Sequence, residues 1–318
     1  MKKNDFMWTV LVHLGNNMWN EEGNTRGREN NPCATASSTL RFDRKLWDTY
    51  MEYLCQKGAN TLIIDVAEAM QYETHPELAV KGSWTKDEMR NEVERLRQMG
   101  FEVVPKLNFS AAHDVWLGEY SHMLSTSIYR QVCADLIREV CEVFKPKYFH
   151  IGMDEENWAL QQNYNYAVIR QNELWWKDFF HLVNCVEKEN ARAWIWSDRM
   201  WEHTEEFLSQ MPKSVLQSNW HYGCNGFYNE PSSEKAAWRI KCFELLNEHG
   251  FDQVPIGSNW NYDENMGILT RWCKEKINPE NLLGMMQTPW LPFIDNEKCR
   301  HALFGAADEL EKAIKAVK

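Results

Sequence analysis

Two neighbouring carboxylates, Asp154 and Glu155, stand directly after a short apolar run that contains His150. An acid that donates a proton, a carboxylate that stabilises positive charge and a histidine are the side chains that general acid–base chemistry uses. Two adjacent side chains on one regular strand point to opposite faces. We therefore expect the backbone to turn where this run ends, so that both carboxylates reach one substrate in different roles.

Polar and aromatic side chains also follow the other apolar runs. A single aspartate in such a place is more often a helix N-cap, and a single tryptophan more often belongs to the core. The recurrence of such residues at the same relative place favours one common site. The set comprises Asp65, Asn108, His113, His150, Asp154, Glu155, Trp196, Asp198, Asn219, Trp220, Trp260, Tyr262, Asp263 and Trp290.

Eight short apolar or β-branched runs predict the strands that should position these residues. Their continuous apolar character is typical of a parallel sheet that is covered on both faces. The runs are Thr9–His13, Thr61–Val66, Val103–Asn108, Tyr148–Gly152, Ala193–Trp196, Val215–Asn219, Val254–Trp260 and Leu282–Met286.

Helices are predicted between these strands. Thr85 and Glu88 form a capping box that begins one helix, and Gly58 stands where another should end. The alternation predicts an α/β protein with a single (β/α)8 TIM barrel, one catalytic domain over residues 1–318. A doubly wound open sheet is the rival, but no G-x-G-x-x-G turn follows the first strand. In such barrels the active site lies at the carboxyl ends of the strands, where the set of polar residues should meet.

Composition restricts the class of partner. The formal net charge of −11 over 318 residues argues against a nucleic-acid-binding protein, which needs a basic face. No apolar run reaches the roughly 20 residues that a membrane-spanning helix needs. The 16 tryptophans are typical of an aromatic core or of flat apolar walls with a polar rim, which suit sugars. We expect no cofactor and no metal, and composition leaves the choice between sugar-binding walls and an aromatic core open.

The nine cysteines are scattered without C-x-x-C spacing, which indicates neither a disulfide framework nor a thiolate zinc site. No apolar signal segment follows the two lysines at the start. A cytoplasmic protein is therefore expected, although a secreted chain without its leader would begin in the same way. Trp175 and Trp176, on a predicted helix, indicate a face for a homo-oligomer or the packing of that helix on the barrel.

The segment HIGMDEENW, which begins at His150, resembles the H-x-G-G-D-E signature of the β-N-acetylhexosaminidases of glycoside hydrolase family 20. The segments around Asp65 and His113 resemble the second and third strands of that family. The later elements W-S-D, S-N-W and N-W-N-Y-D follow in the family's order. The resemblance covers roughly residues 60–290 and implies a divergent member with the catalytic barrel only.

The resemblance implies a role for each matching residue. Glu155 would be the general acid, and Asp154 would polarise the substrate's own acetamido group, whose carbonyl oxygen attacks the anomeric carbon. Tyr262 would hydrogen-bond that oxygen, and Asp65 would orient His113 against Glu155. The implied reaction removes terminal β-linked N-acetylglucosamine or N-acetylgalactosamine with retention. The implied sugar-binding residues are His150, Trp196, Asp198, Trp220, Trp260, Asp263 and Trp290.

Four positions depart from the family's pattern, and one of them is the acid that often follows the last tryptophan, which the segment after Trp290 lacks. Met153 replaces the second glycine of the motif, and Lys106 stands where an acid is usual. The first strand lacks the arginine that grips the outer hydroxyls of the sugar, and His13, Asn16 or Asn17 is expected to substitute. The loss of this arginine leaves the gluco or galacto preference open.

Three alternatives remain open from the sequence. An ordinary retaining glycosidase would use Glu155 as acid and Asp198 or Glu264 as nucleophile, and would not need a 2-acetamido group. A barrel that only binds carbohydrate would not need the acid. A metal-dependent sugar enzyme would use histidine and carboxylate ligands, but no metal-specific spacing is present.

Overall fold

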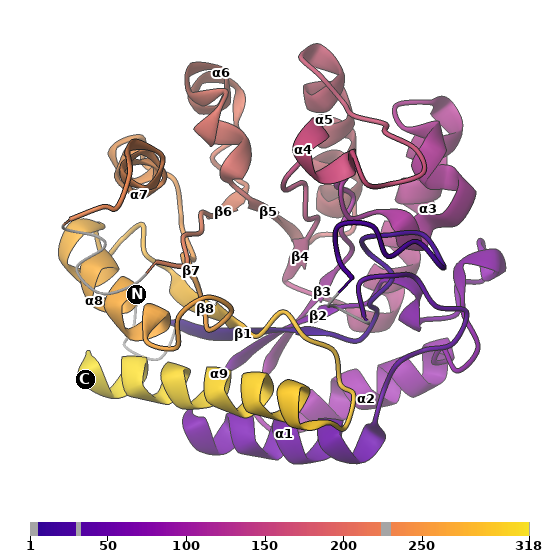
Figure 1. Cartoon of the computed structure of the whole chain (residues 1–318), viewed down its shortest axis with the longest axis horizontal. Helices are drawn as coiled ribbons and strands as arrows, with labels where there is room; N and C mark the ends of the chain where they lie inside the picture. Colours follow the sequence, from indigo (N-terminus) through magenta and orange to yellow (C-terminus); the bar gives the residue numbers. More distant parts are fainter. Residues whose placement is uncertain (1–5, 30–32, 224–229, 318) are drawn as a thin grey trace.

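The computed structural model describes residues 6–29, 33–223 and 230–317. In this part of the chain, eight parallel strands form a ring in the order β6-β5-β4-β3-β2-β1-β8-β7 (Figure 1). Each strand overlaps one of the eight predicted runs, and the predicted (β/α)8 barrel is confirmed. The strands are β1 Met7–His13, β2 Thr61–Asp65, β3 Glu102–Lys106, β4 Tyr148–His150, β5 Arg192–Trp196, β6 Leu216–Ser218, β7 Ile256–Ser258 and β8 Gly284–Thr288.

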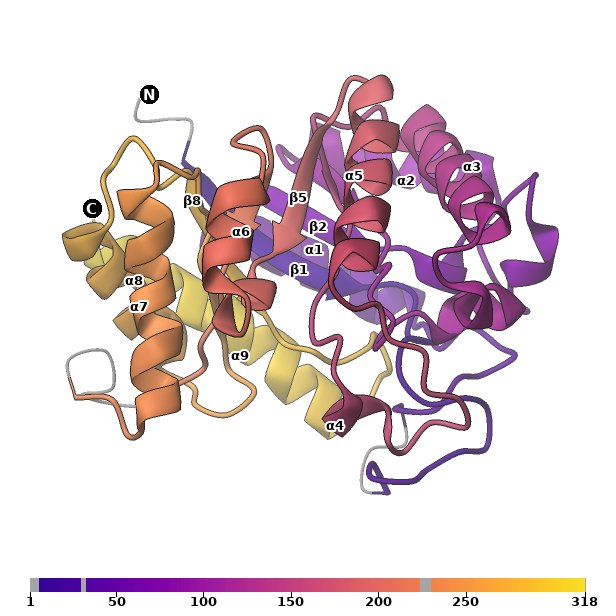
Figure 2. The ribbon, with the colours of Figure 1, turned by 90° about the horizontal axis from the view of Figure 1, so that it is seen from above.

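Helices connect successive strands and surround the ring (Figures 1 and 2). Among the described residues, no helix is both long enough and apolar enough to cross a bilayer. The α-helices are α1 Arg44–Lys57, α2 Lys86–Gln98, α3 Ser127–Phe144, α4 Trp158–Gln161, α5 Glu173–Lys188, α6 Thr204–Gln210, α7 Glu234–Glu248, α8 Asn265–Lys276 and α9 Glu297–Ala316. Short 3-10 helices are Ala67–Ala69, Pro76–Leu78, Val115–Met123 and Asp198–Trp201.

The predicted helix boundaries follow from local chemistry. The Thr85 side chain accepts a hydrogen bond from the Glu88 backbone, and the Glu88 carboxylate accepts one from the Thr85 backbone, which begins α2. Gly58 ends α1 in the left-handed conformation, with φ of 90°.

The first and last strands in the ring order, β6 and β7, are joined where Val254 N, just before β7, donates to Gln217 O at 2.9 Å. Isolated backbone bridges, Gln217 to Gln253 and Trp220 to Ile256, thus complete the ring between β6 and β7.

Strand register places four polar residues at one level of the ring. His13, Asp65 and Lys106 are paired neighbours on β1, β2 and β3, and Lys106 is paired with His150 on β4. All four are buried. The residues two positions earlier on β1, β2 and β3 are Leu11, Ile63 and Val104, which belong to the apolar cluster inside the barrel. Because side chains two apart on a strand face the same way, the four residues form an inward polar layer above an apolar one.

An ion pair holds this polar layer together. The ammonium group of Lys106 binds the Asp65 carboxylate, and His13 Nδ1 lies 3.3 Å from Asp65 Oδ2. Burial raises the pKa of Asp65, but Lys106 and His13 outweigh it and bring that pKa below its ordinary value. Burial lowers the pKa of His13, which keeps the ring neutral. The structure therefore corrects one expectation, because Asp65 pairs with Lys106 and His13 and not with His113.

Lys106→Met is expected to lower the free energy of unfolding by about 3–5 kcal/mol, because it leaves the Asp65 carboxylate buried without its cation. Replacing Asp65 by Asn in the same chain removes that charge, so the double variant should be more stable than K106M alone. Denaturant unfolding at pH 7 measures both. Equal stability of the single and double variants would show that the layer does not depend on this charge pair.

Candidate active site

The chain leaves regular strand geometry directly after β4. Gly152, Met153 and Glu155 have φ of 72°, 76° and 57°, which is the left-handed region. For residues other than glycine this conformation costs about 1–2 kcal/mol each. The turn removes the alternation of a regular strand, so Asp154 and Glu155 both face one cavity. The expected turn is present.

Asn108, which follows β3, holds this turn in place. Its Oδ1 accepts hydrogen bonds from Ser110 N at 3.0 Å and Met153 N at 3.2 Å. Its Nδ2 donates to Asp154 Oδ1 at 2.9 Å. A Cβ atom on Gly152 would lie 2.8 Å from the Cα of Asn108. The two strand ends therefore fit only because residue 152 is glycine.

His113 joins the two carboxylates. Its Nε2 lies 3.3 Å from Asp154 Oδ2 and 3.3 Å from Glu155 Oε2. The Asp154 side chain is 10% exposed, whereas the Glu155 side chain is 32% exposed. One carboxylate is therefore held within the protein, and the other is available to a ligand and to solvent.

Electrostatic interactions determine the charges of the buried pair His113 and Asp154. Burial alone would lower the pKa of His113, but the charge and hydrogen bonds of Asp154, followed by those of Glu155, raise it to about 10. Burial raises the pKa of Asp154, but His113, with Lys106 and Asn108, brings it below its ordinary value. Near neutral pH the site thus holds an imidazolium beside an ionised Asp154.

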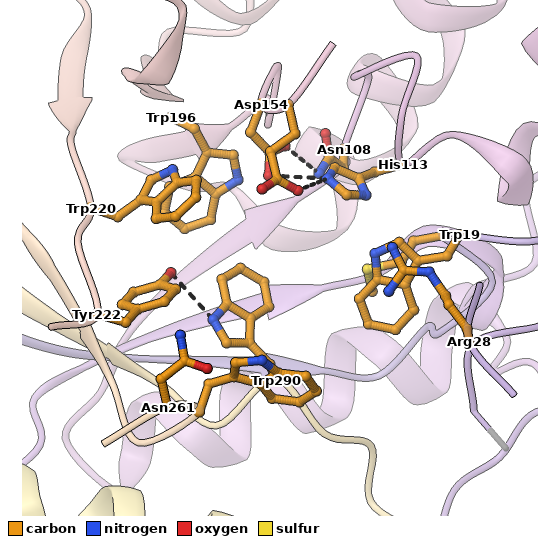
Figure 3. Close-up of a pocket in the computed structure, with 13 residues that line it drawn as sticks. Trp19, Arg28, Asn108, His113, Asp154, Trp196, Trp220, Tyr222, Asn261 and Trp290 are labelled. Carbon is orange, nitrogen blue, oxygen red and sulfur yellow. Dashed lines mark hydrogen bonds and ion pairs between the residues drawn. The ribbon is translucent and has the colours of Figure 1, made fainter. Parts of the chain in front are cut away.

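A cavity of about 250 Å³ opens in front of these groups; we call it the main cavity (Figure 3). Its walls are largely indole and phenol rings, which present flat apolar faces. Trp220 stacks on Tyr222 with 5.2 Å between ring centroids, and Trp290 Nε1 donates to the Tyr222 hydroxyl at 3.2 Å. It is lined by Met18, Trp19, Arg28, Asn108, His113, Asp154, Glu155, Trp196, Trp220, Tyr222, Trp260, Asn261 and Trp290.

Eight of the fourteen residues in the set predicted from the sequence lie in this lining. Asp154 and Glu155 come from the segment after β4, and the tryptophans come from the ends of β5 to β8, as expected. The predicted residues that line the main cavity are Asn108, His113, Asp154, Glu155, Trp196, Trp220, Trp260 and Trp290.

Two predicted sugar-binding histidines lie beneath the walls and not in them. The His13 ring packs under Trp290, with 5.4 Å between centroids, and the His150 ring packs under Trp196 at 4.3 Å. Burial, then the charge of Lys106, lowers the pKa of His150 well below its ordinary value. Both histidines therefore support the walls as neutral rings.

Three other predicted residues lie outside the lining. Tyr262, expected to hydrogen-bond the substrate, has its hydroxyl 3.5 Å from Glu264 Oε2, and Asp263 is exposed. Asp198 lies behind the acid pair, where its Oδ2 accepts a hydrogen bond from Glu155 N at 2.8 Å. Asp198 thus positions the backbone of Glu155.

The sequence analysis missed five lining residues. Tyr222 lines the cavity, whereas Tyr262 does not, and Tyr222 stands only two residues after the predicted Trp220. Trp19 and Arg28 come from the long segment between β1 and α1, with the Arg28 guanidinium 4.9 Å from the Trp19 ring centroid. No periodicity points to them. The remaining two are Met18 and Asn261.

The same acid–base groups have the donor types that bind a divalent cation. His113, Asp154 and Glu155 each offer a ligand atom within 4.8 Å of the others. Histidine must lose its proton to bind a metal. Because the pKa of His113 is raised to about 10, its protonation opposes such binding. The residues fit an acid–base site better than a metal site.

Comparison with known proteins places this geometry in context. No family model matches the sequence, and no curated protein matches it. Solved structures match over most of the chain. The β-N-acetylhexosaminidase from Bacteroides fragilis superposes on 96% of the chain with a TM-score of 0.62 at 10% identity. The chain has the barrel fold of these enzymes.

Two further matches support the same fold. A chitobiase from Flavobacterium johnsoniae matches 87% of the chain with a TM-score of 0.57 at 17% identity. An inactive mutant of a glycoside hydrolase family 20 exo-β-N-acetylglucosaminidase from Vibrio harveyi matches 97% with a TM-score of 0.64 at 13% identity. The chain spans 65%, 51% and 54% of the lengths of the three proteins. The resemblance to this family is thus confirmed for the fold.

Gly152→Ala is expected to lower the free energy of unfolding by about 3 kcal/mol or more, because its Cβ meets the backbone of Asn108 and its φ is left-handed. Gly250→Ala is the matched control. Gly250 has φ of 68° and nothing within 4 Å of an added Cβ, so only the conformational cost of about 1 kcal/mol applies. Denaturant unfolding compares the two, and equal losses would show that Asn108 does not constrain residue 152.

The raised pKa of His113 predicts an imidazolium at pH 8, with both ring nitrogens protonated. Nitrogen-15 NMR of the histidine rings measures this, and His113→Gln identifies the signal. Because the folded-state pKa of about 10 lies above the ordinary 6.5, protonation stabilises the fold fully below about pH 6.5. That contribution is lost as the pH rises toward 10. A neutral ring at pH 8 would contradict the assigned charge.

Proposed function

We propose that the protein is a glycoside hydrolase that removes a terminal β-linked N-acetylhexosamine, with catalysis assisted by the substrate's own acetamido group. The observation that carries the proposal is the pairing of two adjacent carboxylates with different surroundings in one cavity. Asp154 is buried and kept ionised by His113 and Asn108. Glu155 shares His113 but reaches the open part of the cavity.

Each carboxylate suits one role. Glu155 donates a proton to the leaving glycosidic oxygen and later accepts one from the attacking water. Asp154 accepts the acetamido N–H and stabilises the positive charge that develops there as the acetamido oxygen attacks the anomeric carbon. In ordinary two-carboxylate retaining enzymes the second carboxylate attacks the sugar itself. Both oxygens of Asp154 are already engaged, one by Asn108 and one by His113, which favours the polarising role.

The walls suit a single N-acetylated sugar. Ligand cavities usually measure roughly 300–1,000 Å³, so a main cavity of about 250 Å³ takes one ring and not a chain. The Trp196 Nε1 is buried without a hydrogen-bond partner among the described residues and can donate to a sugar oxygen. The Tyr222 hydroxyl accepts from Trp290 and retains its own proton to donate. We assign to Tyr222 the carbonyl contact expected of Tyr262.

The ordinary retaining alternative is less well supported. Burial, then the charge of Asp154, raises the pKa of Asp198 well above its ordinary value, which disfavours the ionised form that a nucleophile needs. Glu264 is exposed outside the cavity lining. We assign the place of the missing first-strand arginine to Arg28, which lines the main cavity from the segment between β1 and α1.

Glu155→Gln and Asp154→Asn should separate the two roles. E155Q is expected to lower kcat/KM for N,N′-diacetylchitobiose about 10²–10⁴-fold, which is the usual contribution of general acid catalysis. Its effect on the 4-nitrophenyl glycoside should be smaller, because nitrophenolate leaves without a proton. D154N should impair both substrates alike, since acetamido attack precedes either departure. Release of sugar and of nitrophenol measures the two rates.

Matched glycosides test the acetamido group. The wild type should cleave 4-nitrophenyl β-N-acetylglucosaminide or its galacto epimer and leave the corresponding glucoside and galactoside intact. Comparable cleavage of the glucoside would favour the ordinary retaining mechanism. Loss of activity with a chelator would favour a metal-dependent sugar enzyme. If folded protein releases nitrophenol from none of these glycosides, the remaining alternative is a barrel that only binds carbohydrate.

A further inference from the structure

A second cavity of about 250 Å³ shares Glu155 with the main cavity; we call it the side cavity. The two are separated by aromatic rings. Trp201 of the side cavity packs edge to face on Trp220 of the main cavity, with 4.5 Å between ring centroids. The side cavity is lined by Asp198, Arg199, Trp201, Lys235, Trp238 and Arg239, among others.

Unpartnered donors point to a ligand rich in acceptors. Arg199 Nε and Nη2, Arg239 Nε and Trp175 Nε1 are buried without a hydrogen-bond partner among the described residues. The Arg199 side chain is only 8% exposed, and its nearest ion-pair contact is Glu206 Oε2 at 3.9 Å from Nη2. A buried donor without an acceptor is costly. Ligand oxygens in the side cavity would remove that cost.

The acids of the side cavity leave these cations largely uncompensated. Burial, and then the charge of Asp154, raise the pKa of Asp198 well above its ordinary value, which favours the neutral carboxyl, and its Oδ1 has no hydrogen-bond partner among the described residues. Glu156 is bound by the guanidinium of Arg170. Glu202 is exposed to solvent. Apart from Glu155 itself, the inner part of the side cavity therefore presents hydrogen-bond donors and positive charge.

The position of the side cavity identifies which part of a substrate it meets. Glu155 protonates the leaving oxygen, so a cavity that Glu155 shares with the sugar-binding cavity lies where the leaving group must be. Trp238 is 40% exposed there, and its Nε1 donates to Trp201 O at 2.8 Å, which fixes the indole as a flat platform. An aromatic platform beside cations suits a sugar that carries a negative charge.

We propose that the side cavity binds the leaving sugar and selects one that carries an anionic group, a carboxylate or a sulfate, which Arg199 and Arg239 contact. This inference rests on the proposed hydrolase function and adds the class of its substrate. Lys235, exposed at the rim, contributes longer-range attraction.

The test compares disaccharides that differ only at C6 of the leaving sugar. They are N-acetylglucosaminyl-β-(1→4)-glucose, its 6-sulfate, and the corresponding glucuronate. The wild type should show a kcat/KM roughly 10- to 100-fold higher for an acidic substrate than for the neutral one, as expected of a charge-assisted hydrogen bond. Comparing kcat/KM for the glucuronate and for the 6-sulfate shows which anion the side cavity prefers.

Variants assign the preference to the side cavity. Arg199→Gln should abolish most of the acidic-to-neutral ratio, Arg199→Lys should restore part of it, and Lys235→Gln should reduce it less. Arg138→Gln is the matched control, because it removes the same charge from the exposed face of α3 and should leave the ratio unchanged. An absent preference, or one that survives in R199Q, would overturn the proposal.

A binding measurement separates this proposal from the proposed hydrolysis. If wild-type protein cleaves none of the disaccharides, titration calorimetry with the glucuronate and neutral disaccharides tests the side cavity directly. Tighter binding of the glucuronate that is lost in R199Q would support an anion site in a protein that is not a hydrolase. Equal or undetectable binding of both would overturn the inference.

Discussion

The buried ion pair between Lys106 and Asp65 is the interaction on which the site depends. Apolar strands of a parallel sheet have little to fix their register, whereas a one-residue shift of β2 against β3 would turn one member of the pair out of the barrel. Two buried charges would then be unpaired, at a cost of several kcal/mol. Register in turn sets the level at which each strand ends. His150, paired beside Lys106, supports Trp196 at the floor of the main cavity.

The chemistry of the site arises where regular structure stops. A continued strand would have sent Asp154 and Glu155 to opposite faces, and the left-handed turn brings them to one. Met153 and Glu155 hold this conformation without being glycine, and the bonds of Asn108 offset the strain. The left-handed turn lowers the stability locally, and it places Asp154 and Glu155, which differ in burial, beside His113. That difference in burial distinguishes their roles.

The sequence was sufficient for the barrel because strand runs, helix stripes and caps are local signals. The acid pair, His113 and the tryptophans could also be predicted, since each follows a strand. The motif match pointed to Tyr262, and Tyr222 was not considered, although it stands two residues after Trp220. Arg28 could not be found, because its place depends on how a long loop folds against distant residues. The pairing of Asp65 required knowledge of the strand register.

If the protein is the hydrolase proposed above, the position of Glu155 between two cavities has a consequence for the order of events in that reaction. Its backbone is fixed, with N–H bound by Asp198 and C=O by Asn157, while its side chain remains partly exposed. A leaving group can depart through the side cavity while the sugar stays seated in the main cavity. Water can then enter along the vacated route and meet the same carboxylate. The departing leaving group and the incoming water both pass Glu155, so the bound sugar need not move between the two halves of the proposed reaction.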